Sequence, residues 1–451
     1  MTDTIVALAT PNGESALSLI RVSGEKALEI ASQACDLKSP TPRHSYLTKY
    51  SSIENETLDQ VIFVFYENGK SFTSEDTIEI ICHGNPILIK EIVNDLLARG
   101  CRIANPGEFS YRSYTNGKID LTQAEAIAEI IAAKSKQSLS LASKNLDGNL
   151  SQKIAELQNE ILNQQSFIEA FIDFPEDDLG DEKTTEIIKS LNVVISDIEA
   201  LIKTADRIQA FNRNLKVVIV GPPNAGKSSI FNCIVGKDRA IVDQNPGTTR
   251  DYVNQVIEIG NTYVELIDTA GIHQTDESIE KEGIKKSITL LKEADLVLIV
   301  FDGSLPYPSK FDDYIDGVLN AKKAVLIQNK ADLPLKINFN TSSLAKFSQI
   351  STSKDDSVSI DNLIKTIEEI LLHDLEKTNE LSLSVNLRQS NALKSSLGSL
   401  EKCMHNLAIN SHLELCVPDL KDSINYLAEI AGSKDNEEML DLLFSNFCIG
   451  K

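Results

Sequence analysis

Short apolar runs alternate with helical stretches over the first part of the chain. Runs with the length of β-strands are Ile5–Ala9, Leu17–Val22, Val61–Tyr66 and Thr77–Cys82. Stretches with helical spacing are Glu25–Cys35 and Pro86–Arg99. Because such an alternation places helices against a sheet, it predicts a separate α/β or α+β domain from Met1 to about Lys118.

From Leu121 the apolar positions follow a helical period instead. Positions that share a helical face are Ala124, Ile127 and Ile131, followed by Ile154, Leu157, Ile161 and Ile168. A turn at Asp147–Asn149 is predicted to separate two helices. Further helices are predicted at Thr184–Phe211, Ser390–Leu407, Leu420–Ala431 and Asn436–Phe447. We expect these helices to form one bundle, because independent arms would leave their apolar faces in water.

The middle of the chain, Leu215–His373, has the pattern of a second α/β domain. Its predicted strands are Leu215–Val220, Tyr252–Ile259, Tyr263–Ile267, Leu296–Phe301, Ala324–Gln328 and Phe347–Ile350. The turn Gly260–Asn261 makes a hairpin of the second and third strands, which predicts a mixed sheet with one antiparallel edge. Since helices flank this domain, we expect it to be inserted into the bundle. The predicted domains are residues 1–118, 119–212, 213–373 and 374–451.

Composition is that of a multidomain protein of the cytoplasm. The 451 residues are 42% hydrophobic, and the sequence shows neither a membrane-spanning run nor a signal segment. Seven cysteines without a C-x-x-C pair favour reduced thiols over disulfides or a zinc site. The net charge of −22 argues against nonspecific nucleic-acid binding, so any RNA contact must be local or shared with a basic partner.

A phosphate-binding loop follows the first strand of the middle domain. Gly221–Ser228 fits the pattern G-x-x-x-x-G-K-S/T, in which backbone N–H groups face the phosphates. Lys227 is expected to reach the outer phosphates and Ser228 to bind Mg²⁺. The segment Ser229–Val235 is expected to begin a helix, whose N-terminus favours an anion.

A guanine-binding motif lies about a hundred residues later. Asn329–Asp332 follows a strand and has the form N-K-x-D. Asp332 is expected to accept hydrogen bonds from the guanine ring N–H and amino group, while Asn329 braces the loop. Ser351 and Thr352 are a weaker candidate for the last loop that contacts guanine. The middle domain is therefore predicted to be a P-loop GTPase domain with a Ras-like mixed sheet.

Two further segments complete the predicted nucleotide site. Asp268–Gly271 ends a strand and is expected to hold the Mg²⁺ shell and approach the terminal phosphate. Within Gly247–Asp251, Thr249 is the favoured second Mg²⁺ ligand. The predicted nucleotide-binding residues are Asn224, Ala225, Gly226, Lys227, Ser228, Ser229, Thr248, Thr249, Asp268, Thr269, Ala270, Gly271, Asn329, Lys330, Asp332, Ser351 and Thr352.

Hydrolysis needs a group that orients water and a positive charge in the transition state. Ile272 replaces the glutamine of Ras-like enzymes, so we favour a carboxylate from Asp276–Glu282. Candidates there are Glu277, Glu280 and Glu282, of which Glu280 is preferred, although these carboxylates are equally suited to capping the next helix. A monovalent cation held by Asn224 and main-chain oxygens of Asp243–Thr248 would replace an arginine finger. Alternatively, Asn224 only favours the turn.

The chain resembles the MnmE (TrmE) family of tRNA-modifying GTPases over essentially its full length. Beyond the GTPase motifs, the matching segments are Asp3–Ala7, Leu19–Gly24, Pro106–Phe109, Asn116–Leu121 and Phe447–Lys451. The resemblance implies a homodimer formed through an N-terminal domain that binds 5-formyl- or 5,10-methylene-tetrahydrofolate. The positions that match the folate site are Arg21, Glu79, Lys118 and Lys451. Surface ion pairs, or an ordinary strand carboxylate for Glu79, are the alternatives.

The resemblance also implies that GTPase domains meet across K⁺ and that Glu280 orients the water. The implied K⁺ positions are Asn224, Asp243, Asn245 and Thr248. Asp243 departs from the expected threonine or serine, and Pro246 precedes Gly247, which puts the affinity for the ion in doubt. Cys448 matches a terminal C-[I/V/L]-G-K motif that the family directs toward the folate pocket, and it is predicted to act at the modification site.

The family activity is addition of a carboxymethylaminomethyl or aminomethyl group to the wobble uridine of certain tRNAs. The implied partner is an FAD-containing protein called MnmG or GidA, in a heterotetramer or larger complex, with no membrane involved. Its basic surface would supply the tRNA contact that this acidic chain lacks. A ribosome-assembly GTPase or a dimerising scaffold GTPase are the alternatives; the former should carry a basic RNA-binding module, which the sequence does not show.

Overall fold

The computed structural model divides the chain into two compact units. It describes residues 3–173, 181–211, 214–236, 253–260, 262–269, 289–308, 311, 323–339, 342–376, 383–408, 413–432, 437–445, 447 and 450. The first unit comprises Met1–Ile131, Ala142–Ala205 and Leu383–Lys451, and the second comprises Ala132–Leu141 and Asp206–Ser382. The four domain boundaries given by the sequence remain predictions.

The first unit contains a six-stranded sheet in the order β3-β4-β5-β2-β1-β6. Its strands are β1 (Ile5–Leu8), β2 (Ser15–Ser23), β3 (Ser45–Ser51), β4 (Thr57–Tyr66), β5 (Thr77–Gly84) and β6 (Arg102–Ile103). Neighbours are antiparallel except β1 and β6, which are parallel. The four predicted strands and two predicted helices of this region are confirmed, whereas β3 and β6 were not predicted.

Helices α1 (Ala27–Ala34) and α2 (Pro86–Ala98) cover one face of this sheet. Their buried residues share a core with alternate strand residues such as Ile20, Val22, Ile78 and Ile80. The start of α2 follows from its sequence. The Asn85 side chain accepts hydrogen bonds from two first-turn backbone N–H groups, and Pro86 has no N–H that would need an acceptor. Since strand side chains alternate between faces, Arg21 and Glu79 lie on the other face.

A buried ion network fixes α3 (Glu108–Thr115) to this domain. Arg112, 1% exposed, donates hydrogen bonds to carboxylate oxygens of Asp3, Glu75 and Glu108 at 2.8 to 3.2 Å. Arg102 donates to Glu108 as well, at 2.6 and 2.9 Å. Burial raises the pKa of Glu108, but the hydrogen bonds from Arg102, Asn105 N–H and Arg112 outweigh it, so the pKa is lowered.

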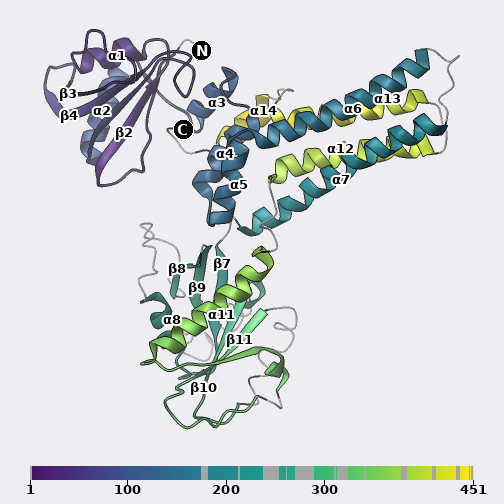
Figure 1. Cartoon of the computed structure of the whole chain (residues 1–451). Coiled ribbons are helices and arrows are strands. Elements are labelled where there is room, and N and C mark those ends of the chain that lie inside the picture. Colours follow the sequence, from purple (N-terminus) through teal and green to yellow (C-terminus); the bar gives the residue numbers. More distant parts are fainter. Residues whose placement is uncertain are drawn as a thin grey trace. The chain divides into compact units, whose positions relative to one another are not determined.

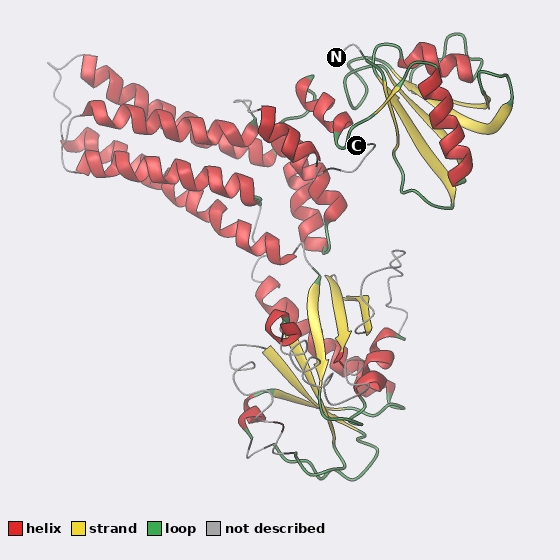
Figure 2. Ribbon diagram, turned by 180° about the vertical axis from the view of Figure 1, so that it is seen from behind, coloured by secondary structure: helices red, strands yellow, loops and turns green. Residues whose placement is uncertain are grey.

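The long helices on both sides of the middle domain share one core, which confirms the predicted bundle. They are α6 (Asn149–Asp173), α7 (Asp181–Phe211), α12 (Leu387–Ala408) and α13 (Cys416–Ala431). They run side by side as paired rods (Figure 1; Figure 2). Helices α4 (Leu121–Ala132) and α5 (Lys136–Leu146) precede them, and α14 (Glu437–Ser445) places Phe444 5.3 Å from Tyr111, ring to ring. The described helices include none long and apolar enough to cross a membrane.

The second unit is built on a six-stranded sheet in the order β12-β11-β10-β7-β9-β8. Its strands are β7 (Leu215–Val220), β8 (Val253–Ile259), β9 (Thr262–Asp268), β10 (Leu296–Asp302), β11 (Lys323–Asn329) and β12 (Ser348–Ser351). Only β8 is antiparallel to its neighbour. Helices α8 (Lys227–Val235) and α11 (Ser357–Glu376) pack on one face, with α11 crossing in front of the sheet in Figure 1. The predicted strands, hairpin and mixed sheet are confirmed.

A carboxyl pair on α4 gives the first unit a titration near neutral pH. Glu125 is held by Arg388 at 2.7 and 2.8 Å and by Gln389 at 2.6 Å. Among the residues that the structure describes, Glu129 receives one hydrogen bond, from Asn386 Nδ2 at 3.3 Å. Burial, followed by repulsion from Glu125, raises the pKa of Glu129 to about 7.

Replacing this group should change the dependence of stability on pH. A raised folded-state pKa stabilises the fold below the ordinary value of 4.5, and this contribution is lost as the pH rises through about 7. We therefore expect Glu129→Gln to match the parent near pH 4.5 and to be more stable at pH 8.5, by up to roughly 3 kcal/mol. Urea unfolding of the full chain at both pH values measures the difference. The control Glu125→Gln, which weakens the Arg388 pair, should be less stable than the parent at both, and equal curves for Glu129→Gln and parent at pH 8.5 would contradict the assignment.

Candidate functional site

The phosphate loop connects the end of β7 to the start of α8 and contacts a second loop at its last glycine. Asn329 Nδ2 donates a hydrogen bond to Ala225 O at 2.9 Å. Gly226 has φ +95°, and a Cβ there would lie 2.1 Å from Asn329 Nδ2. Both the backbone conformation and the close approach therefore require glycine at this position.

Lys227 lies within the loop rather than in solvent. Its Nζ donates to Gly221 O and Pro222 O, both at 3.0 Å. Burial lowers the pKa of this ammonium, and nearby Asp268 partly opposes the shift. A buried cation among backbone dipoles is suited to binding an anion such as phosphate.

A hydroxyl and a carboxylate meet where β9 ends beside α8. Ser228 Oγ donates to Asp268 Oδ2 at 2.7 Å, and Asp268 is buried. Thr269 Oγ1 donates to Ile219 O at 2.8 Å, which fixes the end of β9 against β7. Hydroxyl and carboxylate oxygens are the ligands that Mg²⁺ prefers, so this pair fits the predicted metal.

The loop Asn329–Asp332, which is predicted to bind the base, is held by its own preceding strand, β11, and by the end of β12. Ala331 N donates to Thr352 O at 3.0 Å, and Thr352 N donates to Gln328 O at 2.9 Å. Thr352 Oγ1 lies 3.4 Å from Asn329 Oδ1 and is buried, whereas Ser351 Oγ is exposed and donates to Gln328 Oε1. Thr352 therefore braces this loop, and Ser351 faces the neighbouring strand.

Lys330 and Asp332 of this loop have different partners. Lys330 Nζ lies 2.6 Å from Asp302 Oδ2. Burial raises the pKa of Asp302, but hydrogen bonds from Lys330 and Ser304 outweigh it and the pKa is lowered. Asp332 is exposed and accepts one bond, from Ser353 Oγ at 3.1 Å, so carboxylate oxygen remains for a ligand. Sequence reasoning missed Asp302, although it ends the strand beside Asn329.

Asn224 sits at the tip of the phosphate loop with φ +60° and an exposed side chain. Asparagine tolerates this left-handed conformation, which accounts for its presence in the turn whether or not it also binds an ion. Ser229 is exposed on the first turn of α8. Several predicted residues lie outside the described part of the chain: Asp243, Asn245, Thr248, Thr249, Ala270, Gly271, Glu280, Cys448 and Lys451.

The first unit brings two of the predicted folate residues together. Arg21 and Glu79 are opposite each other on β2 and β5, and Arg21 donates to Glu79 Oε1 from Nε at 3.1 Å and from Nη2 at 2.7 Å. Arg21 Nη1 donates to Gly450 O at 3.2 Å. Tyr66 donates to Glu79 Oε2 at 3.3 Å. Lys118 is exposed, with its Nζ 3.5 Å from Gly69 O, and contacts neither Arg21 nor Glu79 by any hydrogen bond in the described chain.

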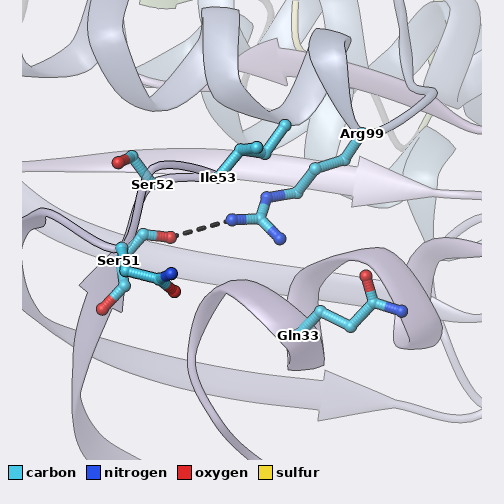
Figure 3. A pocket seen from close by; sticks show the side chains of 6 residues that line it. Gln33, Ser51, Ser52, Ile53 and Arg99 are labelled. Atoms are coloured by element: carbon cyan, nitrogen blue, oxygen red, sulfur yellow. Dashed lines mark hydrogen bonds between the residues drawn. The ribbon is translucent and has the colours of Figure 1, made fainter.

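A separate cavity of about 390 Å³ lies near the β3–β4 turn (Figure 3). Its lining residues are Gln33, Ser51, Ser52, Ile53, Asn55 and Arg99. Arg99 donates to Ser51 O at 2.9 Å and to Asp95 Oδ2 at 2.7 Å. Asp95 also accepts from Tyr50 OH and Ile53 N, so Arg99 belongs to a network that holds this turn. No residue predicted to be functional lines this cavity.

Comparisons with known proteins cover the full chain. A family model described as MnmE helical domain matches residues 121–448, and one described as GTP-binding protein TrmE N-terminus matches residues 4–118. A tRNA modification GTPase MnmE of Opitutus terrae is 37% identical over 449 residues, covering 100% of this chain and 99% of that protein. The protein of the same name from Aquifex aeolicus is 35% identical over 453 residues, covering 100% of both chains.

Solved structures resemble part of the chain. Era from Aquifex aeolicus bound to GDP and aluminium fluoride is 21% identical with a TM-score of 0.27, covering 41% of this chain and 66% of that chain. The G domain of the FeoB iron transporter of T. maritima is 24% identical with a TM-score of 0.26, covering 36% of this chain and 98% of that chain.

The exposed carboxylate of Asp332 provides a test of base recognition. A carboxylate only accepts hydrogen bonds and so matches the two donors of guanine, whereas an amide matches the donor and acceptor of xanthine. We expect Asp332→Asn to weaken GTP binding by roughly 100-fold and to strengthen xanthosine triphosphate binding, because unpaired polar groups reject the wrong base. Competition binding with the two nucleotides measures this. The control Ser351→Ala should keep the parent preference, and an unchanged preference in Asp332→Asn would exclude this loop from base recognition.

Proposed function

The chain belongs to the MnmE family of tRNA modification GTPases, and on that premise we propose that it binds and hydrolyses GTP to drive a modification of the tRNA wobble uridine. The observation that carries the proposal is the convergence of three loops at the carboxyl ends of β7, β9 and β11. There, Asn329 joins the base loop to the phosphate loop and Ser228 meets Asp268. Ligands of α/β proteins bind at this edge of the sheet.

Each described residue has a chemical role in this proposal. Lys227 exchanges its backbone oxygen partners for the outer phosphates of GTP. Ser228, with Thr249, would hold Mg²⁺, which neutralises phosphate charge, and Asp268 would orient the ion's water ligands. Asp332 reads the guanine edge while Asn329 and Thr352 keep its loop in place.

Hydrolysis in this proposal relies on Glu280 and on K⁺. Glu280 orients the attacking water, since Ile272 has no polar atom to do so. Asn224, with Asp243, Asn245 and Thr248, would hold K⁺ where two GTPase domains meet, and the ion would supply positive charge for the phosphates. Binding through main-chain oxygens would tolerate Asp243.

The uridine modification is assigned to the first unit of a homodimer with its FAD-containing partner, MnmG, and tRNA. Arg21, Glu79, Lys118 and Lys451 would bind a formyl- or methylene-tetrahydrofolate that supplies the one-carbon unit, and Cys448 would act in the modification. The described part of this site supports the proposal because Arg21 and Glu79 form one polar patch beside the Phe72 and Phe109 rings. The nucleotide cycle then sets whether the modification site is productive.

Turnover of GTP in KCl and in NaCl at equal ionic strength tests the ion. We expect hydrolysis to be roughly 100-fold faster in KCl, the effect of one charge-stabilising group, and the rate per chain to rise with protein concentration. Asn224→Gly keeps the left-handed turn but removes the side chain, so it should lose the K⁺ effect while the remaining phosphate-loop contacts still bind GTP. Equal slow rates of the parent in both salts would overturn K⁺-dependent hydrolysis.

The link between hydrolysis and modification is tested at Glu280. We expect Glu280→Ala to bind GTP, to lose hydrolysis by about 100-fold or more, and to fail to restore wobble-uridine modification in cells that lack the parent protein. Glu277→Ala removes a neighbouring carboxylate and should behave like the parent. Normal tRNA modification by a Glu280→Ala chain that does not hydrolyse GTP would separate the two activities, and normal modification in cells without the protein would favour a scaffold role.

A further inference from the structure

Part of the second unit comes from outside the inserted segment. Residues Ala132–Leu141 lie in sequence between α4 and α5, yet they belong to the second unit together with Asp206–Ser382. The chain therefore passes between the two units at four places rather than the two that an insertion needs.

This segment is bonded to the start of β9. Ser135 forms an antiparallel bridge with Thr262, and Tyr263 N donates to Lys134 O at 3.1 Å. A bond between the residues flanking the bridge is the pattern of a non-hydrogen-bonded antiparallel pair, in which opposite Cα atoms approach to about 4.5 Å. The contact is made through backbone atoms and lies next to the Gly260 turn.

The same segment begins helix α5. Ser138 N donates to Ser135 Oγ at 3.1 Å, and Ser135 N donates to Ser138 Oγ at 3.2 Å, so the two hydroxyls cap the helix reciprocally. Helix α5 continues without a break from the second unit into the first. In the first unit, Asn145 near its end donates to Ser384 O at 2.9 Å. Helix α5 therefore links the contact with Thr262 at the start of β9 to Ser384, which follows the middle domain in sequence.

The other end of β9 carries the nucleotide chemistry. In the β8–β9 hairpin, Ile259 pairs with Thr262 at the turn and Val253 pairs with Asp268 at the opposite end. Asp268 contacts Ser228, as described above. At about 3.3 Å per residue, Thr262 and Asp268 are roughly 20 Å apart along a strand that is hydrogen-bonded on both sides. Such a strand moves as one piece, so a shift at Asp268 reaches Thr262.

We propose that residues 133–138, the coupling segment, transmit nucleotide-dependent shifts of β9 through α5 to the helical unit. This inference rests on the proposed function, because GTP and GDP must act differently at Asp268. In this proposal Lys134, Ser135 and Thr262 have a positioning role, and none of them contacts the nucleotide. Within the first unit, Asn145 of α5 donates a hydrogen bond to Ser384 O. The next residue, Val385, donates its backbone N–H to Thr204 Oγ1 at 3.2 Å.

Substitutions at Thr262 separate coupling from folding. Thr262 is buried and its hydroxyl has no partner among the described residues, so Thr262→Val removes a polar atom without loss and is the matched control. Thr262→Asp places a carboxylate against Ser135 and should release the segment while leaving Asp268 in its strand. Ser135→Cys with Thr262→Cys provides a locked form, because non-hydrogen-bonded pairs accept a disulfide.

Hydrogen exchange of the full chain, with GDP and with a non-hydrolysable GTP analogue, is the measurement. In the parent, in Thr262→Val and in the oxidised double-cysteine chain we expect exchange at the amides of α5 to differ between the two nucleotides by about fivefold or more, at the low end of usual coupling between sites. In Thr262→Asp the Tyr263 amide should be deprotected and the nucleotide difference at α5 should vanish.

Nucleotide affinity and GTP turnover on the same samples separate the two ideas. The proposal is supported if Thr262→Asp binds nucleotide with the affinity of the parent chain but shows no difference in α5 exchange between the two nucleotides. A full nucleotide effect at α5 in Thr262→Asp with the Tyr263 amide deprotected, or no effect in a parent chain that binds and hydrolyses GTP, overturns it. Failure of the parent to bind or hydrolyse GTP would instead refute the proposed function.

Discussion

The nucleotide site depends on the hydrogen bond from Asn329 Nδ2 to Ala225 O. These residues are 104 positions apart in sequence, and their contact joins the loop proposed to bind phosphate to the loop proposed to recognise the base. The approach is so close that Gly226 must lack a Cβ, and Asn329 is itself held by Thr352. A nucleotide is held at its base and at its phosphates, so this amide and this glycine place the two predicted contact regions together.

The sequence predicted the central strands of the second unit, β7, β10 and β11, because they are buried on both faces. Strand β10 is almost wholly apolar and buried along its length, so neither its period nor its neighbours were needed to find it. Strand β3 was missed because Tyr50 is its one buried residue and the others are half-buried or exposed, and β6 has only two residues, both exposed. The phosphate and base loops were found because their chemistry requires particular residue types at fixed spacing.

Contacts that join distant segments could not be predicted in the same way. The burial of Arg112 depends on Asp3, Glu75 and Glu108, and a charged residue on a short helix gives no sign of such partners. The coupling segment could not be predicted either, because it contacts β9 at Lys134 and Ser135, through backbone atoms, and has no strand pattern. A single bridge is formed by backbone atoms and does not require particular side chains. A polar linker can therefore pair with a strand at one residue.

The Arg21–Glu79 pair constrains what the proposed folate site can recognise. Arg21 donates two N–H bonds to Glu79 and one to Gly450 O, so two of its five donors have no partner within the described part of the chain. Glu79 keeps acceptor capacity beyond its bonds from Arg21 and Tyr66. Because the two charges neutralise each other, a simple anion gains little here. A flat heterocycle with a hydrogen-bond donor and an acceptor on adjacent atoms can donate to Glu79 and accept from Arg21. The Phe72 and Phe109 rings beside Arg21 can pack against the faces of such a ring. The geometry therefore favours the ring end of a folate over its glutamyl end at Arg21.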